Sequence, residues 1–266
     1  MIGLIVGIVA VIITFLLKGV SPVILINLPS IFIVIIGSSG AVITSFGMSE
    51  FKKAFKLIGI ASKSAKHSGR AVRDQLVAFA ERARREGLLA LENDVNEVAD
   101  PFLKRGLQMV IDGMEPETVE EVLELELEAM KRRHARGINL FAMWAGYAPT
   151  FGILGAVMGL IAVMAHLSEP EKLGAGIQVA FIATLIAVGL ANIVFMPISV
   201  ALRGHDEGEV TERQMAMAGI LAIQAGDNPR IVAQKLETFL SPAELKAIAA
   251  GAGTTASGAG AAREAA

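Results

Sequence analysis

The chain has 266 residues, of which 53% are hydrophobic, and its mean hydropathy is +0.58. This composition is too apolar for an ordinary soluble domain of that length and indicates an integral membrane protein. The net charge of -2 argues against a general nucleic-acid binder, and the absence of cysteine excludes disulfides and thiolate metal sites.

Four apolar segments are candidates for crossing a bilayer, which takes roughly 20 residues. They cover about residues 2–17, 24–46, 139–167 and 175–201. We expect the first to be a retained helix and not a cleaved signal peptide, because its apolar run begins directly after Met1 and its lysine, Lys18, follows the run. The sequence therefore predicts an all-α integral membrane protein with four transmembrane helices.

Basic residues set the expected topology. They crowd the exit of the second segment and the entrance of the third, and one follows the fourth: Lys52, Lys53, Lys56, Lys63, Lys66, Lys131, Arg132, Arg133, Arg136 and Arg203. Positive residues mark the cytoplasmic side of a membrane protein. We therefore expect spans in residues 1–47 and 139–202, both termini in the cytoplasm, and a large cytoplasmic insert at 48–138 between the second and third spans.

The insert is predicted to be helical. Apolar residues recur at helical spacing over residues 76–98. Asp100-Pro101 is expected to open a further helix that Asp112-Gly113 closes, and Glu115-Pro116 to open the next, with its proline in the first turn. The insert should thus contain several helices that pack against one another.

The segment after the fourth span is expected to stay in the cytoplasm. Residues 203–248 show helical patterns that Gly226-Asp227-Asn228 interrupts, and Pro229 should begin a new helix. From residue 249 to 266 the chain is mostly Ala, Gly, Ser and Thr, which cannot form a core. We predict a disordered tail there.

The third span, residues 139–167, has features that a simple anchor does not need. Pro149 must interrupt the backbone hydrogen bonds, and Thr150 adds a hydroxyl. Small residues then follow at helical spacing: Gly152, Gly155, Ala156 and Gly159. A packing groove for a neighbouring helix explains the glycines as well as a functional surface does. The proline and the hydroxyl together favour a helix that bends beside something polar.

None of the four spans contains Asp, Glu, Lys or Arg between its ends. An ion path through hydrocarbon normally needs an ionisable group, so the carboxylate must come from another chain. Among the hydroxyls of the spans, Thr184 is the best candidate, at about the depth of Ala156 by helical rise. The alternative is that Thr184 only bonds its own helix at i−4, which is common.

A charged cluster in the insert could bind a partner. Arg82, Arg84 and Arg85 are followed by Glu92, and a spacing of seven or eight residues would place Glu92 on the same helical face as Arg85 or Arg84. The alternative is an ordinary solvated face of an amphipathic helix. No metal-ligand spacing of histidines and no G-x-S-x-G, Walker A or dinucleotide-binding motif occurs, so we expect no enzyme activity, no cofactor and no metal site.

Four motifs resemble the MotA/TolQ/ExbB ion-channel family: YAPTFGILGAVMGLIAVM at 147–164, LGAGIQVAFIATLIAVGLANIVFMPIS at 173–199, ARREGLLALEND at 83–94 and IQAGDNPRIV at 223–232. The resemblance covers nearly the whole chain except the tail. The paired N-terminal spans favour the flagellar stator branch over the three-span ExbB and TolQ branch. Two rivals remain: an energiser of another envelope process of the ExbB/TolQ type, and a membrane scaffold or sensor that conducts nothing.

The resemblance implies roles for individual residues. It implies that Pro149, Thr150 and Ala156 of the third span, Thr184 of the fourth and the cytoplasmic Pro229 lie along the ion path. Thr184 would face a carboxylate of the partner. It further implies that Arg84, Arg85 and Glu92 contact the rotor.

The resemblance also implies partners. Members of the stator branch form a homopentamer in the bacterial inner membrane around two single-span, peptidoglycan-binding B subunits, each with one essential aspartate. Ion flow turns the ring against a rotor switch-complex protein and powers motility. In sodium-type members a threonine occupies the position held here by Ala156. This chain is therefore expected to carry H⁺, and Na⁺ is the less favoured ion.

Overall fold

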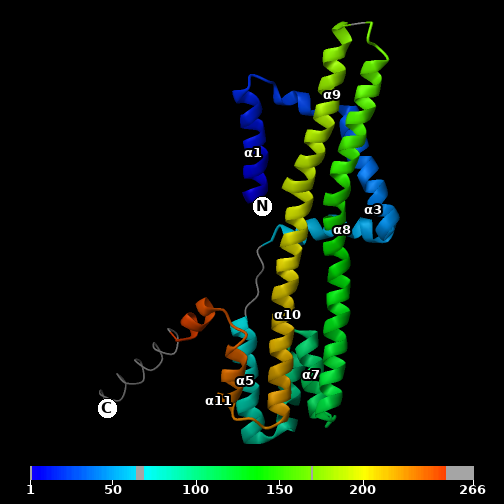
Figure 1. Ribbon diagram of the computed structural model, residues 1–266. Helices are drawn as coiled ribbons and strands as arrows, with labels where there is room; N and C mark the ends of the chain where they lie inside the picture. The colour runs from blue at the N-terminus through cyan, green and yellow to red at the C-terminus, as the bar shows by residue number, and fades with distance from the viewer. Residues whose placement is uncertain (1, 64–68, 169, 250–266) are drawn as a thin grey trace, which may run out of the picture. The chain divides into compact units, whose positions relative to one another are not determined.

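The computed structural model describes residues 2–63, 69–168 and 170–249, which form helices and no strand (Figure 1). The elements in chain order are α1 (Ile2–Leu17), η1 (Pro22–Leu25), α2 (Leu28–Ile31), η2 (Phe32–Gly37), α3 (Ser38–Phe46), α4 (Met48–Ala61), α5 (Gly69–Glu86), η3 (Leu88–Leu91), α6 (Glu92–Glu97), α7 (Pro101–Ile111), α8 (Pro116–Met164), α9 (Pro170–Gly189), η4 (Leu190–Phe195), α10 (Met196–Gln224) and α11 (Pro229–Glu237). η1 and η3 are short 3₁₀ turns, whereas η2 and η4 are π-helical. The predicted tail lies outside the described residues except for residue 249.

Among the residues that the structure describes, three helical stretches are long and apolar enough to cross a membrane: Leu28–Phe46, Pro116–Met164 and Leu173–Gln224. The first covers most of the second predicted span, the next most of the third, and the last contains the fourth. α1 is equally apolar but has 16 residues, fewer than the roughly 20 that span a bilayer without adaptation. The all-α fold and its membrane-spanning helices are therefore confirmed.

The chain divides into two compact units. The first comprises residues 1–64 and 132–205, and the second residues 65–131 and 206–266. The long helices α8 and α10 each contribute residues to both units. The second unit thus joins most of the predicted insert to the segment that follows the fourth span.

The predicted helix boundaries of the second unit are largely confirmed. The Asp100 side chain caps α7 by accepting a hydrogen bond from the backbone N–H of Phe102 at 2.8 Å. Gly113, with φ of +76°, follows the end of α7, and α8 begins at Pro116 as expected. Asn228 caps α11, which starts at Pro229. The core that these helices enclose includes Leu76, Leu91, Val95, Leu103, Leu107, Leu123, Met215, Ile220, Val232 and Leu236.

One expectation about helix continuity is wrong. Residues 76–98 do not form one helix, because Gly87, with φ of +88°, ends α5 and the chain restarts in η3 and α6. A positive φ is costly for any residue with a Cβ, so this glycine permits the break. The last helix of the insert continues into the third span as one helix of 49 residues, α8, which runs through Pro149.

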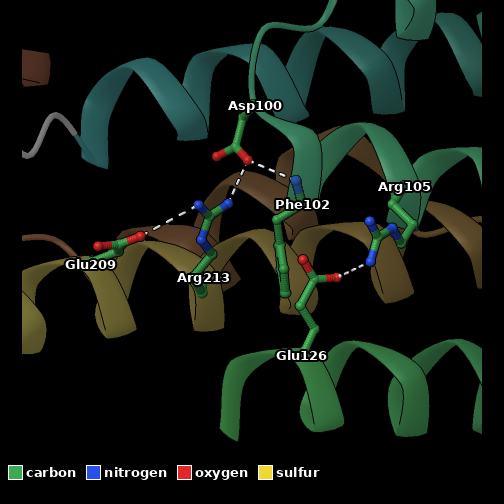
Figure 2. A network of polar contacts seen from close by, with 6 residues as sticks. All are labelled: Asp100, Phe102, Arg105, Glu126, Glu209 and Arg213. Carbon is green, nitrogen blue, oxygen red and sulfur yellow. Dashed lines mark hydrogen bonds and ion pairs between the residues drawn. The ribbon is translucent and has the colours of Figure 1, made fainter. Parts of the chain in front are cut away.

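Figure 2 shows a polar network at the start of α7. The Arg213 guanidinium on α10 donates to the Asp100 carboxylate, lies 3.5 Å from that of Glu209, and stands 5.0 Å from the centre of the Phe102 ring. Nearby, Arg105 pairs with Glu126 of α8 at 2.8 Å. These contacts attach α7 to both long helices within the second unit.

We expect Asp100→Ala to weaken the second unit. It removes the cap of α7, worth about 1 kcal/mol, and the Arg213 contact, whose value is reduced because the Asp100 side chain is 42% exposed. Thermal unfolding of the purified protein should begin about 2–4 °C lower. Asp100→Asn keeps a capping oxygen and serves as the control. If Asp100→Asn lowers the unfolding temperature as much as Asp100→Ala does, the cap does not provide the larger share of the lost stability.

Candidate functional site

Gly152, Gly155 and Gly159 of the third span face α9. A Cβ added at Gly155 would lie 3.1 Å from the Cβ of Ala183, and one at Gly159 would lie 3.1 Å from the Cβ of Ala180. A Cβ at Gly152 would collide with that of Ala187. These small residues let the two backbones approach closely, as in other membrane helix pairs. The packing-groove interpretation of the glycines is therefore confirmed.

This packing fixes the neighbourhood of the two hydroxyls. Thr184 is half-buried and lies beside the contact, with its Cα 3.3 Å from a Cβ built at Gly152. Its hydroxyl lies 3.5 Å from the carbonyl oxygen of Ala180, so the expected i−4 hydrogen bond is present but long. Thr150 is exposed and donates to the carbonyl of Tyr147 at 2.7 Å. Both hydroxyls still have acceptor lone pairs for an incoming group.

The other predicted path residues, Ala156, Pro149 and Pro229, have different surroundings. Ala156 is half-buried and lies within about one turn of the level of Thr184, given the Gly155–Ala183 contact. Pro149 is half-buried inside α8, and its ring nitrogen cannot donate a hydrogen bond. Pro229 belongs to the second unit, where it begins α11, and the structure gives no placement of it relative to the spans.

The centre of the first unit is an aromatic cluster that the sequence reading did not identify. Trp144 on α8 stacks on Phe195 of η4, with ring centroids 4.4 Å apart and planes at 15°, and lies 5.3 Å from the Phe51 ring. Its indole N–H donates to the Ser38 hydroxyl at 3.0 Å, and both side chains are buried. The available signal was that Trp144 is the only tryptophan in the chain and lies in a span.

Another face of α8 is open. Apolar side chains beyond Gly152 are 47–61% exposed within this chain: Ile153, Leu154, Val157, Met158, Leu160 and Ile161. α9 likewise exposes Phe181 to 73%. Apolar surfaces of this size on spanning helices face lipid or other chains. They leave room for the protein neighbours that a channel would need.

Pro149→Ala should separate stability from function. Proline inside a helix costs about 3 kcal/mol, so the alanine variant should be at least as stable to heat and should reach normal membrane levels. It restores a backbone hydrogen bond and changes the helix beside Thr150, so we expect motility to fall severalfold. Gly146→Ala is the matched control, because a Cβ there meets no atom within 4 Å. Full motility of Pro149→Ala would remove the proline from the mechanism.

The charged cluster is arranged differently from the prediction. Arg85 and Glu92 lie on opposite sides of the break at Gly87, so the shared helical face is wrong. All three predicted contact residues, Arg84, Arg85 and Glu92, are nevertheless exposed, and no ion pair within the described part of the chain involves them.

The Arg82 side chain instead bridges the break. Its guanidinium donates to both oxygens of Asp94 at 2.6 and 2.5 Å and to Glu86 at 3.1 Å. The hydrogen bonds to Asp94, with a smaller contribution from Glu86, raise the pKa of Arg82 above its usual value. Arg82 therefore stays charged and joins the end of α5 to α6, which holds the two halves of the exposed cluster together.

Comparison with known proteins shows to which family the chain belongs. Residues 94–215 match the MotA/TolQ/ExbB proton channel family, and residues 1–87 match the motility protein A N-terminal family. Motility protein A of Borreliella burgdorferi is 39% identical over 81% of this chain and 83% of its own. The flagellar MotAB stator complex from Bacillus subtilis contains a chain 36% identical, with a TM-score of 0.87 over 93% of this chain and 98% of its own. For C. jejuni MotAB the TM-score is 0.86 at 31% identity, over 91% and 94% of the two chains. The chain belongs to the MotA/TolQ/ExbB proton channel family, within its motility protein A group.

Proposed function

We propose that this chain supplies the walls of a proton path and turns ion flow into rotation. By its family and relatives the chain is a subunit of a flagellar stator. The observation that carries the proposal is the close Gly–Ala packing of α8 and α9, which places Thr184 beside a helix face without any ionisable group. Such a wall conducts only when a second chain brings a titratable group to it.

The second chain is a B subunit with one membrane span, a peptidoglycan-binding region and an essential aspartate. The likeness to chains of MotAB stator complexes supports such a partner. Burial of the aspartate disfavours its charged form, so its protonation changes which neighbouring surface it prefers. Five copies of this chain in a ring would present that surface in turn, and each protonation would advance the ring by one step.

The proposed topology has four spans in the bacterial inner membrane, with both termini in the cytoplasm. α1 is the first span despite its 16 residues, because a short apolar helix can be accommodated by local thinning of the bilayer. The basic residues on α4 and those of α8 that precede the third span then face the cytoplasm. The second unit would lie there too, where a rotor can reach it.

The exposed residues Arg84, Arg85 and Glu92 are proposed to contact a rotor switch-complex protein. Glu92→Lys, or Arg84→Glu with Arg85→Glu, should reduce swimming severalfold without changing membrane levels, because exposed single charges contribute little to folding. A charge reversal on the rotor should restore part of the motion. Glu97→Lys reverses another exposed charge on α6 and should leave swimming normal. Normal swimming of all the variants would support the solvated-face interpretation.

The whole proposal is tested by complementation. A motile bacterium that lacks its own A and B subunits is supplied with this chain and the B subunit from the same source, and swimming is measured in soft agar. Restored swimming that needs both chains is expected. If the two chains assemble in the membrane and restore a different envelope process but never motility, the stator assignment is wrong.

A further inference from the structure

We propose that the first unit holds an anionic phospholipid in an apolar groove between α1, the end of α4 and the fourth span, which here comprises η4 and the start of α10. One acyl chain lies in the groove, and the phosphate of the headgroup faces Lys63. The inference goes beyond the proposed proton path and does not depend on it.

The groove forms where α1 and the fourth span diverge. At Gly7 they are in contact, because an added Cβ would lie 3.1 Å from Cγ2 of Ile193 in η4. At Gly3, one turn earlier in α1, an added Cβ would meet no atom within 4 Å. The cavity that opens there has a volume of about 520 Å³, and Ile58 and Ala61 near the end of α4 also line it.

The lining of the groove suits an acyl chain. Along the fourth span it runs from Asn192 to Ala201, which is about 14 Å at a rise of 1.5 Å per residue. Most of the lining is apolar, as at Pro197 and Ile198, and the Asn192 amide donates to the carbonyl oxygen of Val188 in its own helix. Because the surrounding lipid is as apolar as the groove, burial of the tail alone gives no selectivity. The headgroup must supply it.

A positive charge marks one end of the groove. Ser62, which lines the groove, is followed directly by Lys63, whose side chain is exposed. The carbonyl oxygen of Lys63 lies 3.1 Å from Nε2 of His205, one turn beyond Ala201 on α10. This contact holds Lys63 at the end of the groove that Ala201 lines. No ion pair between described residues involves Lys63, so its ammonium is available to a phosphate.

α4 places this end of the groove at the level of the headgroups. The helix follows the second span after a turn at Gly47, and its apolar face packs on the core of the first unit. Its lysines Lys52 and Lys56 are exposed. A helix with one apolar and one basic face lies in the interface between hydrocarbon and water. In the proposed topology Lys63 therefore lies among the phosphates of the cytoplasmic leaflet, where its charge favours an anionic lipid over a zwitterionic one.

Native mass spectrometry of the complex with its B subunit measures the bound lipid. The complex in detergent is titrated with phosphatidylglycerol, which is anionic, or with phosphatidylcholine, which is zwitterionic. Phosphatidylglycerol should bind about fivefold more tightly, the effect of one lysine near a membrane surface. Lys63→Ala should abolish this preference, and Lys63→Arg should keep it. Lys52→Ala is the matched control, because it removes an exposed lysine of α4 that does not adjoin the groove.

Filling the groove tests the site without changing a charge. Gly3→Leu places an apolar side chain in the open space, so it should displace lipids of both kinds and lower the number retained by one per copy of this chain. Gly40→Leu adds the same side chain at an exposed glycine of α3, where a Cβ also meets no atom within 4 Å, and should leave the number unchanged.

Two results would overturn the proposal: a preference for phosphatidylglycerol that survives Lys63→Ala, or a number of retained lipids that Gly3→Leu does not lower. Both are expected if a neighbouring copy of the chain fills the groove instead of a lipid. The measurement needs no ion flow. A complex that retains the lipid as expected but conducts nothing would therefore support this site and contradict the proposed channel.

Discussion

Reconstituted into liposomes without a B subunit, this chain should pass no protons. No Asp, Glu, Lys or Arg lies between the ends of the predicted spans, and the hydroxyls of Thr150 and Thr184 cannot carry a proton across hydrocarbon alone. Co-reconstitution with the B subunit should produce flux driven by the membrane potential, which supplies about 2.3 kcal/mol per charge per 100 mV. A pH-sensitive dye inside the liposomes measures both cases.

The control replaces the aspartate in the span of the B subunit by asparagine, which keeps the size of the side chain and removes its titration. Flux should then return to the level of empty liposomes although the complex is still assembled. Robust conduction by this chain alone would overturn the mechanism, because the protons would then follow a path that no partner carboxylate completes.

Local signals predicted the helix ends well. Asp100-Pro101 and Asn228-Pro229 each combine a capping side chain with a proline in the first turn, and both begin helices in the structure. The break at Gly87 was missed because the apolar spacing continues across it: Leu91 and Val95 are buried in the same core as Leu76. Hydrophobic periodicity reports which residues are buried and does not reveal a turn that keeps them on one side.

The candidate site was predictable in part. The small residues of α8 indicated close packing, and the packing against Ala180, Ala183 and Ala187 follows from their size. The π-helical turns were not predictable, because their residues are the same apolar types that form α-helices. The buried hydrogen bond of Trp144 joins it to Ser38, 106 positions away, and no local pattern predicts such a contact.

Ion choice should depend on the level of Thr184. Sodium needs several oxygen ligands in place of its hydration shell, whereas a proton needs one carboxylate and a path of water. Ala156 has no side-chain oxygen to offer at this level, so the hydroxyl of Thr184 and the aspartate of the B subunit would make a poor sodium site. Motility that depends on this stator should therefore continue when sodium is replaced by potassium at fixed pH, and it should stop when a protonophore is added.

Ala156→Thr tests the same argument from the other side. Ala156 is half-buried and within about one turn of Thr184, so an added hydroxyl could reach an ion held beside that residue. We expect the motility of this variant to become dependent on sodium. Ala156→Val is the control, because valine has nearly the shape of threonine without its hydroxyl, and its motility should not depend on sodium. If rotation of the unmodified stator stops without sodium but survives the protonophore, the assignment of the proton is reversed. If neither variant changes the response to sodium, Ala156 and Thr184 do not share one ion path.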